Sequence, residues 1–206
     1  MTSKPYFIGL AGPSGSGKSH LATTLQRELG PETCGVLSLD SYYRDLGHLP
    51  AEKRKKTDFD QPAALDACRM RADLQRLKSG LPIEVPIYDF ATHARKPETV
   101  VFPAMPAVII EGIFIFCFPE LSALLDLRIY VNVDVEICLA RRLARDVHDR
   151  GRDESGVREQ FDRWVRPSVE KWVLPQMALA DLVLDGTRPA GELVGQILPH
   201  IPRMPQ

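Results

Sequence analysis

Short apolar runs recur along the chain, each bounded by glycine, proline or charged residues. The first run, at residues 6–11, reads "YFIGLA" and leads into a glycine-rich stretch. A continuous apolar run of this length is typical of a strand that is buried on both faces of a parallel sheet. Similar runs follow, and they predict strands at residues 34–40, 107–112, 127–133 and 180–186.

Helical periodicity fills most of the intervals between these runs. Residues 18–29 carry Leu21, Leu25 and Leu29 four positions apart, which places them on one helical face. Gly30 and Pro31 follow and predict the end of this helix. Strands and helices that alternate in this way predict an α/β fold, a parallel sheet with helices on both faces.

One segment, residues 80–106, breaks the alternation. It is rich in proline and contains two short β-prone pieces, at residues 83–88 and 99–102. Within sheets proline is confined to edges and bulges, so we expect a hairpin-like flap beside the sheet, outside the core.

Composition narrows the class of protein. The length of 206 residues predicts a single domain over the whole chain, and the net charge of −1 gives no electrostatic case for a nucleic-acid or membrane partner. The four cysteines form no C-x-x-C pair, and three have apolar neighbours, as reduced thiols of a cytoplasmic protein do. The start has no signal-peptide pattern, and the most apolar stretch is too short to span a bilayer.

Residues 12–19 read "GPSGSGKS" and match the phosphate-binding loop G-x-x-x-x-G-K-[ST] between a predicted strand and a predicted helix. Glycines let successive backbone N–H groups face phosphate oxygens, and the helix N-terminus adds partial positive charge. Lys18 would neutralise the outer phosphates, and Ser19 could hold Mg²⁺. The predicted nucleotide-binding residues are Gly12, Ser14, Gly15, Ser16, Gly17, Lys18, Ser19 and His20.

Two predicted strands end in an acidic residue, one in Asp40 and the other at Glu111. Ligands of open α/β sheets bind at the carboxyl ends of the strands, where a carboxylate can hold Mg²⁺ directly or through water. We therefore predict a metal role for Glu111. The competing interpretations are a solvated strand end for Glu111 and a helix N-cap for Asp40.

Other motifs separate the classes of phosphate-binding-loop proteins. The N-K-x-D guanine signature of GTPases is absent from the sequence, and no coupling element of an ATP-driven motor is evident. The remaining class is a small kinase, in which the attacking hydroxyl needs a positioned base.

A basic segment, residues 141–152, reads "RRLARDVHDRGR". Charged residues recur in it at three- and four-residue steps and so share one helical face: Arg142, Arg145, Asp149 and Arg152. They could simply pair along the helix, Arg142 with Asp146 and Arg145 with Asp149. Further cations beside Gly151 suit a lid, at about residues 141–156, that closes over a transferring phosphate.

The motifs along the chain are, in order, "GPSGSGKS", "LSLDSYY", "DFDQPAALD", "PIYDFATHAR", "VIIEGIF", "RRLARDVHDRGR", "QFDRWVRP" and "ADLVL". This set resembles the uridine kinases (uridine–cytidine kinases) of the phosphoribulokinase and uridine kinase superfamily. The resemblance covers about residues 6–185. The chain departs from it after the last predicted strand, where "DGTRPAG" stands in place of a Gly-Gly-x-Asn stretch.

The resemblance implies roles for residues whose own context is ambiguous. Asp40 would be the general base, close to the ribose 5′-hydroxyl and to Mg²⁺. Phe59 would contact the base and Asp60 the ribose hydroxyls, whereas their own context indicates a core aromatic and a turn residue. The remaining implied roles are the pyrimidine edge for Tyr88 and His93, the pocket wall for Tyr43, the phosphates for Arg142, and the ribose for Arg152 and Gln160.

The predicted activity is therefore transfer of the γ-phosphoryl group of ATP, or another NTP, to the 5′-hydroxyl of uridine or cytidine. Its catalytic residues would be Asp40, Lys18 and Arg142, with Mg²⁺ held by Ser19, Asp40 and Glu111. The resemblance also implies a homo-oligomer, a tetramer. The alternatives are a related kinase acting on a phosphorylated sugar, pantothenate or nicotinamide riboside, against which "YDFATH" argues, and a nucleotide-binding regulator without catalysis, against which Asp40 and the arginine-rich lid argue.

Overall fold

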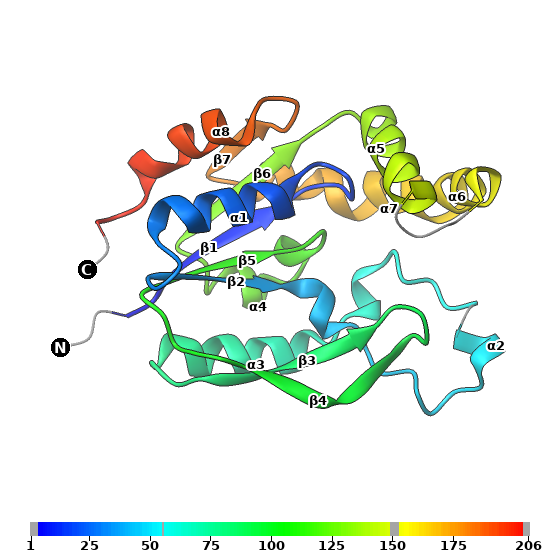
Figure 1. The fold of residues 1–206 in the computed structure, drawn as a ribbon, viewed down its shortest axis with the longest axis horizontal. Coiled ribbons are helices and arrows are strands. Elements are labelled where there is room, and N and C mark those ends of the chain that lie inside the picture. Colours follow the sequence, from blue (N-terminus) through cyan, green and yellow to red (C-terminus); the bar gives the residue numbers. More distant parts are fainter. Residues whose placement is uncertain (1–3, 55, 149–152, 204–206) are drawn as a thin grey trace.

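A computed structural model describes residues 4–54, 56–148 and 153–203. At its centre lies a five-stranded parallel sheet in the order β2-β5-β1-β6-β7 (Figure 1). The strands are β1 (Tyr6–Ala11), β2 (Cys34–Ser38), β5 (Ala107–Glu111), β6 (Leu127–Asn132) and β7 (Leu182–Asp185). The prediction of an α/β fold with a parallel sheet is confirmed.

The side chains of the central strands alternate between two apolar layers. In β1, Phe7 and Ala11 pack into one cluster, while Ile8 and Leu10 pack into the other. This is the two-residue period of a strand, with both faces of the sheet covered. A strand in this position has no solvent-facing side, and this explains why its sequence is apolar throughout.

Helices cover both faces of the sheet (Figure 1). On one face, α1 (Lys18–Leu29) and α8 (Ala190–Ile197) contribute leucine and valine side chains to a single cluster. On the other face lies α3 (Ala67–Lys78). The other helices are α2 (Ala51–Arg54), α4 (Pro119–Ser122), α5 (Val135–His148), α6 (Glu154–Gln160) and α7 (Arg166–Ser168).

Residues 154–179 form one helical stretch whose turns vary in width. Two five-residue π-helical segments, Phe161–Val165 and Val169–Val173, flank α7, and a 3₁₀ segment, Leu174–Leu179, follows. Phe161, Val165, Val169 and Val173 are buried at four-residue steps in the cluster that contains Phe7. This stretch therefore lies against the core, and it holds Gln160 at the start of the first wide segment.

A separate antiparallel hairpin consists of β3 (Ile83–Asp89) and β4 (Ala94–Phe102) (Figure 1). The hairpin prediction is confirmed, but β4 begins well before residue 99. The expectation that the hairpin lies outside the core is wrong, because Ile83, Val85 and Tyr88 are each at most 8% exposed and belong to the main cluster. Pro86 lies next to a register shift in the ladder, and such irregularities are where strands accommodate proline.

β2 ends at Ser38, and residues Leu39–Tyr42 form a 3₁₀ turn. The Ser38 hydroxyl caps this turn by accepting a hydrogen bond from the Asp40 N–H at 3.3 Å. The prediction that Asp40 ends the strand is therefore wrong, because Asp40 lies in the turn just beyond it.

No helix in the described parts of the chain is long and apolar enough to cross a membrane. All four cysteines are free thiols, and Cys34 and Cys138 are buried. Cys68 is exposed.

Candidate active site

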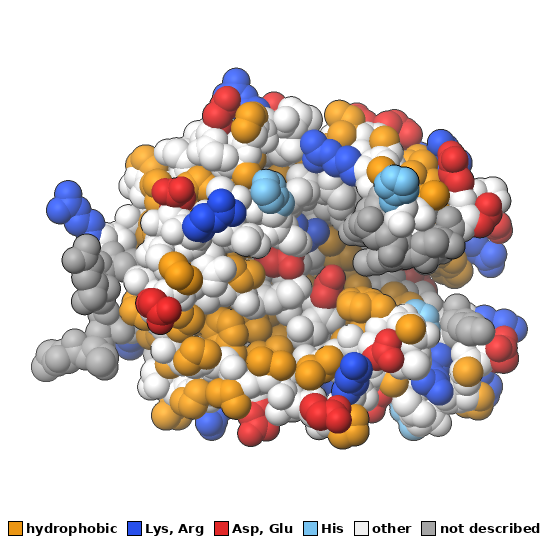
Figure 2. Space-filling model, in the orientation of Figure 1, with side chains coloured by type: hydrophobic (Ala, Val, Ile, Leu, Met, Phe, Trp, Pro, Cys, Tyr) orange, Lys and Arg blue, Asp and Glu red, His pale blue; other side chains and the backbone are white. Residues whose placement is uncertain are grey.

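A cavity of about 510 Å³ lies at the carboxyl end of the parallel sheet. Figure 2 shows this side of the molecule hollowed between the part that holds α5 and the part that holds the hairpin, with acidic side chains inside. The lining residues are Ser14, Gly15, Gly17, Lys18, Ser19, His20, Asp40, Tyr43, Phe59, Asp60, Tyr88, Phe90, His93, Glu111, Ile113, Arg141, Arg142 and Gln160.

The cavity brings together almost all of the predicted site residues. Gly12 and Ser16 do not line it, because Gly12 forms the turn that follows β1 and the Ser16 side chain is buried. Arg152 lies outside the described residues, as does the predicted pairing of Arg145 with Asp149. The site therefore assembles from seven stretches that are separate in the sequence.

The phosphate-binding loop has the conformation that its glycines permit. Gly12, Gly15 and Gly17 all have positive φ angles, of 147°, 87° and 90°. A Cβ atom on Gly15 would lie 2.8 Å from the carbonyl oxygen of Cys138 in α5, so the loop and this helix are in close contact. Lys18 is buried, and its Nζ donates a hydrogen bond to the Pro13 carbonyl at 3.4 Å.

One serine hydroxyl connects Asp40 and Glu111, two of the three acidic residues that line the cavity. Ser38 Oγ donates to Glu111 Oε1 at 2.8 Å, and it also accepts the Asp40 N–H. Glu111 is 7% exposed, so its carboxylate is held in a nearly enclosed position at the end of β5.

The oxygen donors of this part of the cavity fit a hard divalent cation. Ser19, Asp40 and Glu111 all line it, and the described residues hold no group of three or more His, Cys, Asp or Glu that could bind a metal by themselves. Mg²⁺ is usually held by one or two carboxylates together with water and substrate phosphates. Two carboxylates and a hydroxyl beside a phosphate-binding loop are the set that such an ion needs.

The opposite wall of the cavity is aromatic. The ring of Tyr43 lies 5.3 Å from that of Tyr88 and 5.9 Å from that of Phe59, measured between centroids. Phe59 in turn stacks on His93 at 4.5 Å with an angle of 16° between the planes. Burial raises the pKa of Tyr88 to about 12, so this hydroxyl stays protonated at neutral pH.

Two buried polar atoms in this wall lack a partner. Among the described residues, neither the Tyr88 hydroxyl nor the Gln160 side-chain carbonyl oxygen has a hydrogen-bond partner, and both residues line the cavity. Buried polar atoms are almost always paired in folded proteins. These two atoms therefore point to a polar ligand that completes them.

Desolvation raises the pKa of Asp60, which lies in the same wall, although the positive charge of Arg142 acts in the opposite direction. A hydrogen-bond donor from a ligand would stabilise this enclosed carboxylate.

Helix α5 places two arginines beside the phosphate-binding loop. Arg142 pairs with the buried Asp146 at 3.5 Å, as the alternative interpretation of this segment predicted, and it lines the cavity as well. Arg141 donates to the carbonyl oxygens of Gly15 and Gly186 at 3.3 and 3.2 Å. The Arg142 side chain is thus both paired along the helix and present in the site.

Sequence reasoning missed three lining residues, which are Phe90, Ile113 and Arg141. Phe90 lies within "PIYDFATHAR" and Arg141 precedes Arg142, so both were inside recognised motifs. Ile113 also lies inside a recognised motif, "VIIEGIF", but its apolar side chain gave no signal of its own.

A phosphate-binding loop that opens α1, two acids at the ends of neighbouring strands and basic side chains from α5 define a P-loop kinase. The chain belongs to the phosphoribulokinase / uridine kinase family, whose family model matches residues 7–189.

Relatives of known assignment are similar over most of their length. The uridine kinase of Serratia proteamaculans is 41% identical over 191 residues, which are 89% of this chain and 90% of that protein. The uridine kinase of Klebsiella pneumoniae is 40% identical over 188 residues, 89% of this chain and 88% of that protein. The family resemblance found in the sequence is confirmed.

Solved structures share the fold. A putative fructose transport system kinase from Silicibacter sp. superposes with a TM-score of 0.71 at 23% identity, covering 87% of this chain and 89% of that one. Phosphoribulokinase from Rhodobacter spheroides superposes with a TM-score of 0.63 at 15% identity, covering 92% of this chain and 75% of that one. At these identities the likeness shows the fold alone.

Proposed function

We propose that this protein is a uridine/cytidine kinase of pyrimidine salvage. It transfers the γ-phosphoryl group of ATP to the ribose 5′-hydroxyl and produces UMP or CMP. The relatives named above support this substrate class, because uridine kinases align with nearly the whole chain. One observation in the cavity carries the proposal further. The buried Tyr88 hydroxyl and Gln160 carbonyl have no partner in the described part of the chain, and a nucleoside offers polar groups to both.

The acceptor nucleoside occupies the aromatic half of the cavity. Tyr43 and Phe59 provide apolar surface for a pyrimidine ring, and Tyr88 and His93 face its polar edge. Asp60 and Gln160 bind the ribose hydroxyls, together with Arg152 from outside the described residues. An aromatic surface with a few polar groups suits a flat, partly polar base.

The donor nucleotide occupies the other half, on residues 12–20. The phosphates lie among the backbone and side chains of Gly15, Gly17, Lys18 and Ser19. Ser19, Asp40 and Glu111 would hold an Mg²⁺ ion, which would neutralise charge on the donor phosphates.

Asp40 is the general base of the reaction. The 5′-oxygen forms a bond to the γ-phosphorus as the bond from that phosphorus to the bridging oxygen breaks. The hydroxyl proton passes to Asp40, and the departing ADP keeps the electron pair. Lys18 and Arg142 balance the negative charge that spreads over the phosphoryl oxygens.

An acceptor panel tests this proposal. The purified protein, ATP and Mg²⁺ are incubated with uridine, cytidine, adenosine, pantothenate, nicotinamide riboside and ribulose 5-phosphate, and ADP release is followed. We expect turnover with uridine and cytidine and formation of the 5′-monophosphates. Faster turnover with any other alcohol, or none with all of them, would contradict the proposal.

The family resemblance implies an assembly state, and the cysteines indicate a location in the cell. We propose a homo-oligomer, specifically a tetramer, and a cytoplasmic location, which suits four free thiols. Light scattering on the purified protein measures the first, and fractionation of cells measures the second.

A further inference from the structure

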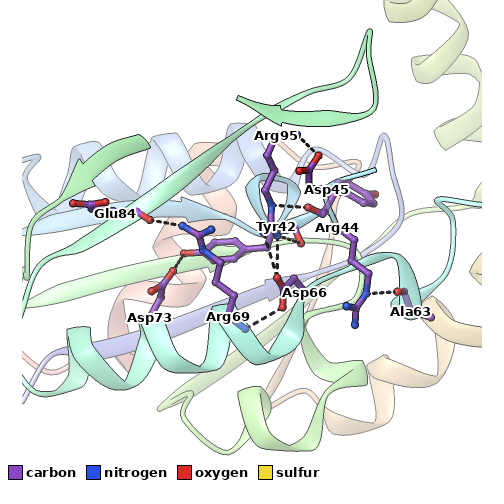
Figure 3. Close-up of polar contacts among 10 residues, drawn as sticks. Tyr42, Arg44, Asp45, Ala63, Asp66, Arg69, Asp73, Glu84 and Arg95 are labelled. Carbon is purple, nitrogen blue, oxygen red and sulfur yellow. Dashed lines mark hydrogen bonds and ion pairs between the residues drawn. The ribbon is translucent and has the colours of Figure 1, made fainter. Parts of the chain in front are cut away.

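Arg95, near the start of β4, contacts two other segments of the chain, residues 42–45 and Asp66 (Figure 3). Its Nε donates to the Tyr43 carbonyl oxygen at 2.9 Å, and a terminal nitrogen donates to the Tyr42 carbonyl oxygen at 3.3 Å. Both terminal nitrogens lie 3.3 Å from Asp66 Oδ2. Its backbone N–H donates to Asp45 Oδ1 at 3.1 Å.

The contacts of Arg95 join two parts of the proposed nucleoside site that are far apart in the sequence, residues 40–43 and the hairpin. Tyr43 follows directly on the 3₁₀ turn that contains Asp40, while the hairpin carries Tyr88 and His93. The side chains of the two parts touch mainly through aromatic rings, such as Tyr43 on Tyr88. Ring contacts tolerate sliding, whereas hydrogen bonds to backbone carbonyls fix both distance and direction.

Asp66 anchors the same arginine to α3. Its Oδ1 caps the helix by accepting the Arg69 N–H at 3.1 Å, which leaves Oδ2 for Arg95. The Asp66 N–H donates to the Tyr42 carbonyl at 2.8 Å. The side chain of Arg95 is only 14% exposed, so these bonds are largely sheltered from water.

We propose that Arg95 is a positioning residue for the acceptor nucleoside. It holds the hairpin and residues 40–43 in one relative geometry, so that the base-facing side chains and the general base meet the same substrate. This inference rests on the proposed function, and it assigns Arg95 no contact with the substrate.

The geometry requires arginine rather than a positive charge alone. A guanidinium presents its N–H groups in a rigid planar fork, and here the fork reaches two carbonyl oxygens and a carboxylate. A lysine ammonium offers three donors from a single atom and cannot reproduce that spread. Arg95→Lys therefore separates geometry from charge.

Arg69 provides a matched control. It donates to the Glu84 carbonyl oxygen of the same hairpin at 3.2 Å, and neither Arg69 nor Glu84 lines the cavity (Figure 3). Arg69→Met thus removes an arginine bond between α3 and the hairpin but leaves in place the hydrogen bonds of Arg95 to Tyr42, Tyr43 and Asp66.

The experiment compares Arg95→Lys, Arg95→Met and Arg69→Met with the parent enzyme in kcat, in KM for uridine and ATP, and in thermal stability. We expect both Arg95 variants to lose about 10-fold or more in kcat/KM for uridine, the effect of losing hydrogen bonds to charged groups. KM for ATP should stay within about two-fold of the parent value. Arg69→Met should keep parental kinetics even if it loses as much thermal stability as the Arg95 variants.

Hydrogen–deuterium exchange gives a readout that does not depend on activity. In Arg95→Lys, peptides covering residues 40–46 and 87–96 should exchange faster, and peptides of residues 12–20 should not change. If the parent enzyme does not phosphorylate nucleosides, the proposed function is refuted, but the exchange comparison still tests whether Arg95 holds the two segments together. Unchanged exchange in both peptides, equal losses in the Arg95 and Arg69 variants, or an equal rise in KM for ATP would overturn the positioning role.

Discussion

Ser38 forms hydrogen bonds to both Asp40 and Glu111. A hydroxyl can donate and accept at once, and Ser38 donates to Glu111 while it accepts the Asp40 N–H. The proposed base is therefore placed by the cap of a 3₁₀ turn rather than by the strand itself. This arrangement puts a carboxylate beyond the sheet edge, where a substrate hydroxyl can reach it.

Replacing Asp40 should separate catalysis from binding. Asp40→Asn keeps the size of the side chain but removes the base and one charge near the metal. We expect kcat to fall by at least ~10²-fold, the scale of general-base removal, while the Kd for uridine stays close to the parent value. Steady-state kinetics and calorimetry measure the two quantities. Asp162→Asn, which removes an exposed carboxylate paired with Arg166, is the control, and activity of Asp40→Asn within a few-fold of it would disprove the assignment.

His93 should make the choice between uridine and cytidine depend on pH. Uracil presents an acceptor at position 4 and cytosine a donor, and neutral imidazole can serve either, whereas imidazolium can only donate. Burial and the nearby Arg54 hold the pKa of His93 below its ordinary value, outweighing Asp89. The proton therefore binds below pH ~6.5, and the ratio of kcat/KM for uridine over cytidine should rise as pH falls through that range.

The control for this pH effect must respect the backbone of His93, which has a φ of 52°. Asparagine tolerates this left-handed conformation and does not titrate, so His93→Asn should flatten the ratio. The measurement is the ratio of kcat/KM for the two nucleosides from about pH 5 to pH 8, the range around the reference pKa. A flat ratio in the parent, with His93 titrating by NMR inside that range, would show that His93 does not read position 4.

At the scale of elements, α5 packs directly on the phosphate-binding loop. The backbone of Cys138 approaches Gly15, and Arg141 from the same helix donates to the carbonyl oxygens of Gly15 and Ser16. In a planar trans peptide the carbonyl and the N–H point in opposite directions. Bonds that hold the Ser16 carbonyl toward α5 therefore turn the Gly17 N–H the other way, so the helix and the loop depend on each other.

A side chain at Gly15 should disturb this contact. In Gly15→Ala the new Cβ would lie 2.8 Å from the Cys138 carbonyl oxygen, on a residue with a φ of 87°. We expect a loss of about 1–3 kcal/mol in stability from the strained backbone, and a KM for ATP at least several-fold higher. KM for uridine should change less. Thermal unfolding and initial rates measure these effects.

Gly195→Ala is the matched control in α8. A Cβ there meets no atom within 4 Å, and the residue lies inside a helix. Alanine should stabilise the protein by about 0.5–1 kcal/mol and leave both KM values unchanged. Equal effects of the two substitutions would mean that the contact between α5 and the loop has no influence on ATP binding.

At the scale of the whole molecule, the sequence predicted the sheet better than its surroundings. Continuous apolar runs located the strands because a parallel strand that is buried on both faces has apolar residues at every position. The burial of β3 was missed because Pro86 suggested an edge, while the bulge that accommodates it has no sequence signature. The meeting of Asp60, His93 and Gln160 came from the family resemblance, since each alone looks like an ordinary turn, surface or helix residue.

The tertiary role of Arg95 could not be predicted from its neighbours in the chain. Its acceptors are the carbonyl oxygens of Tyr42 and Tyr43 and the carboxylate of Asp66, and backbone carbonyls are the same in every sequence. Only the packing of the hairpin on residues 40–45 brings them together.

Binding of uridine and binding of ATP should each stabilise the whole fold, and removal of Mg²⁺ should weaken only the effect of ATP. The proposed nucleoside site draws on the hairpin, residues 40–60, α5 and α6, and would need no metal, whereas the proposed nucleotide site would share Ser19, Asp40 and Glu111 with Mg²⁺. A ligand at 100 times its Kd adds about 2.7 kcal/mol to the free energy of unfolding, and each kcal/mol raises Tm by about 2–4 °C in a protein of this size.

We expect uridine to raise Tm equally with Mg²⁺ and with EDTA. The increase in Tm caused by ATP should shrink markedly in EDTA, because the phosphates then lose their counter-ion. Glu111→Gln should show the same small increase with ATP whether or not Mg²⁺ is present, while its response to uridine stays parental. Thermal unfolding of both proteins under the four conditions makes the measurement. A uridine response that also disappears in EDTA would place the metal in the acceptor half and would contradict the assignment of Ser19, Asp40 and Glu111 to the nucleotide side.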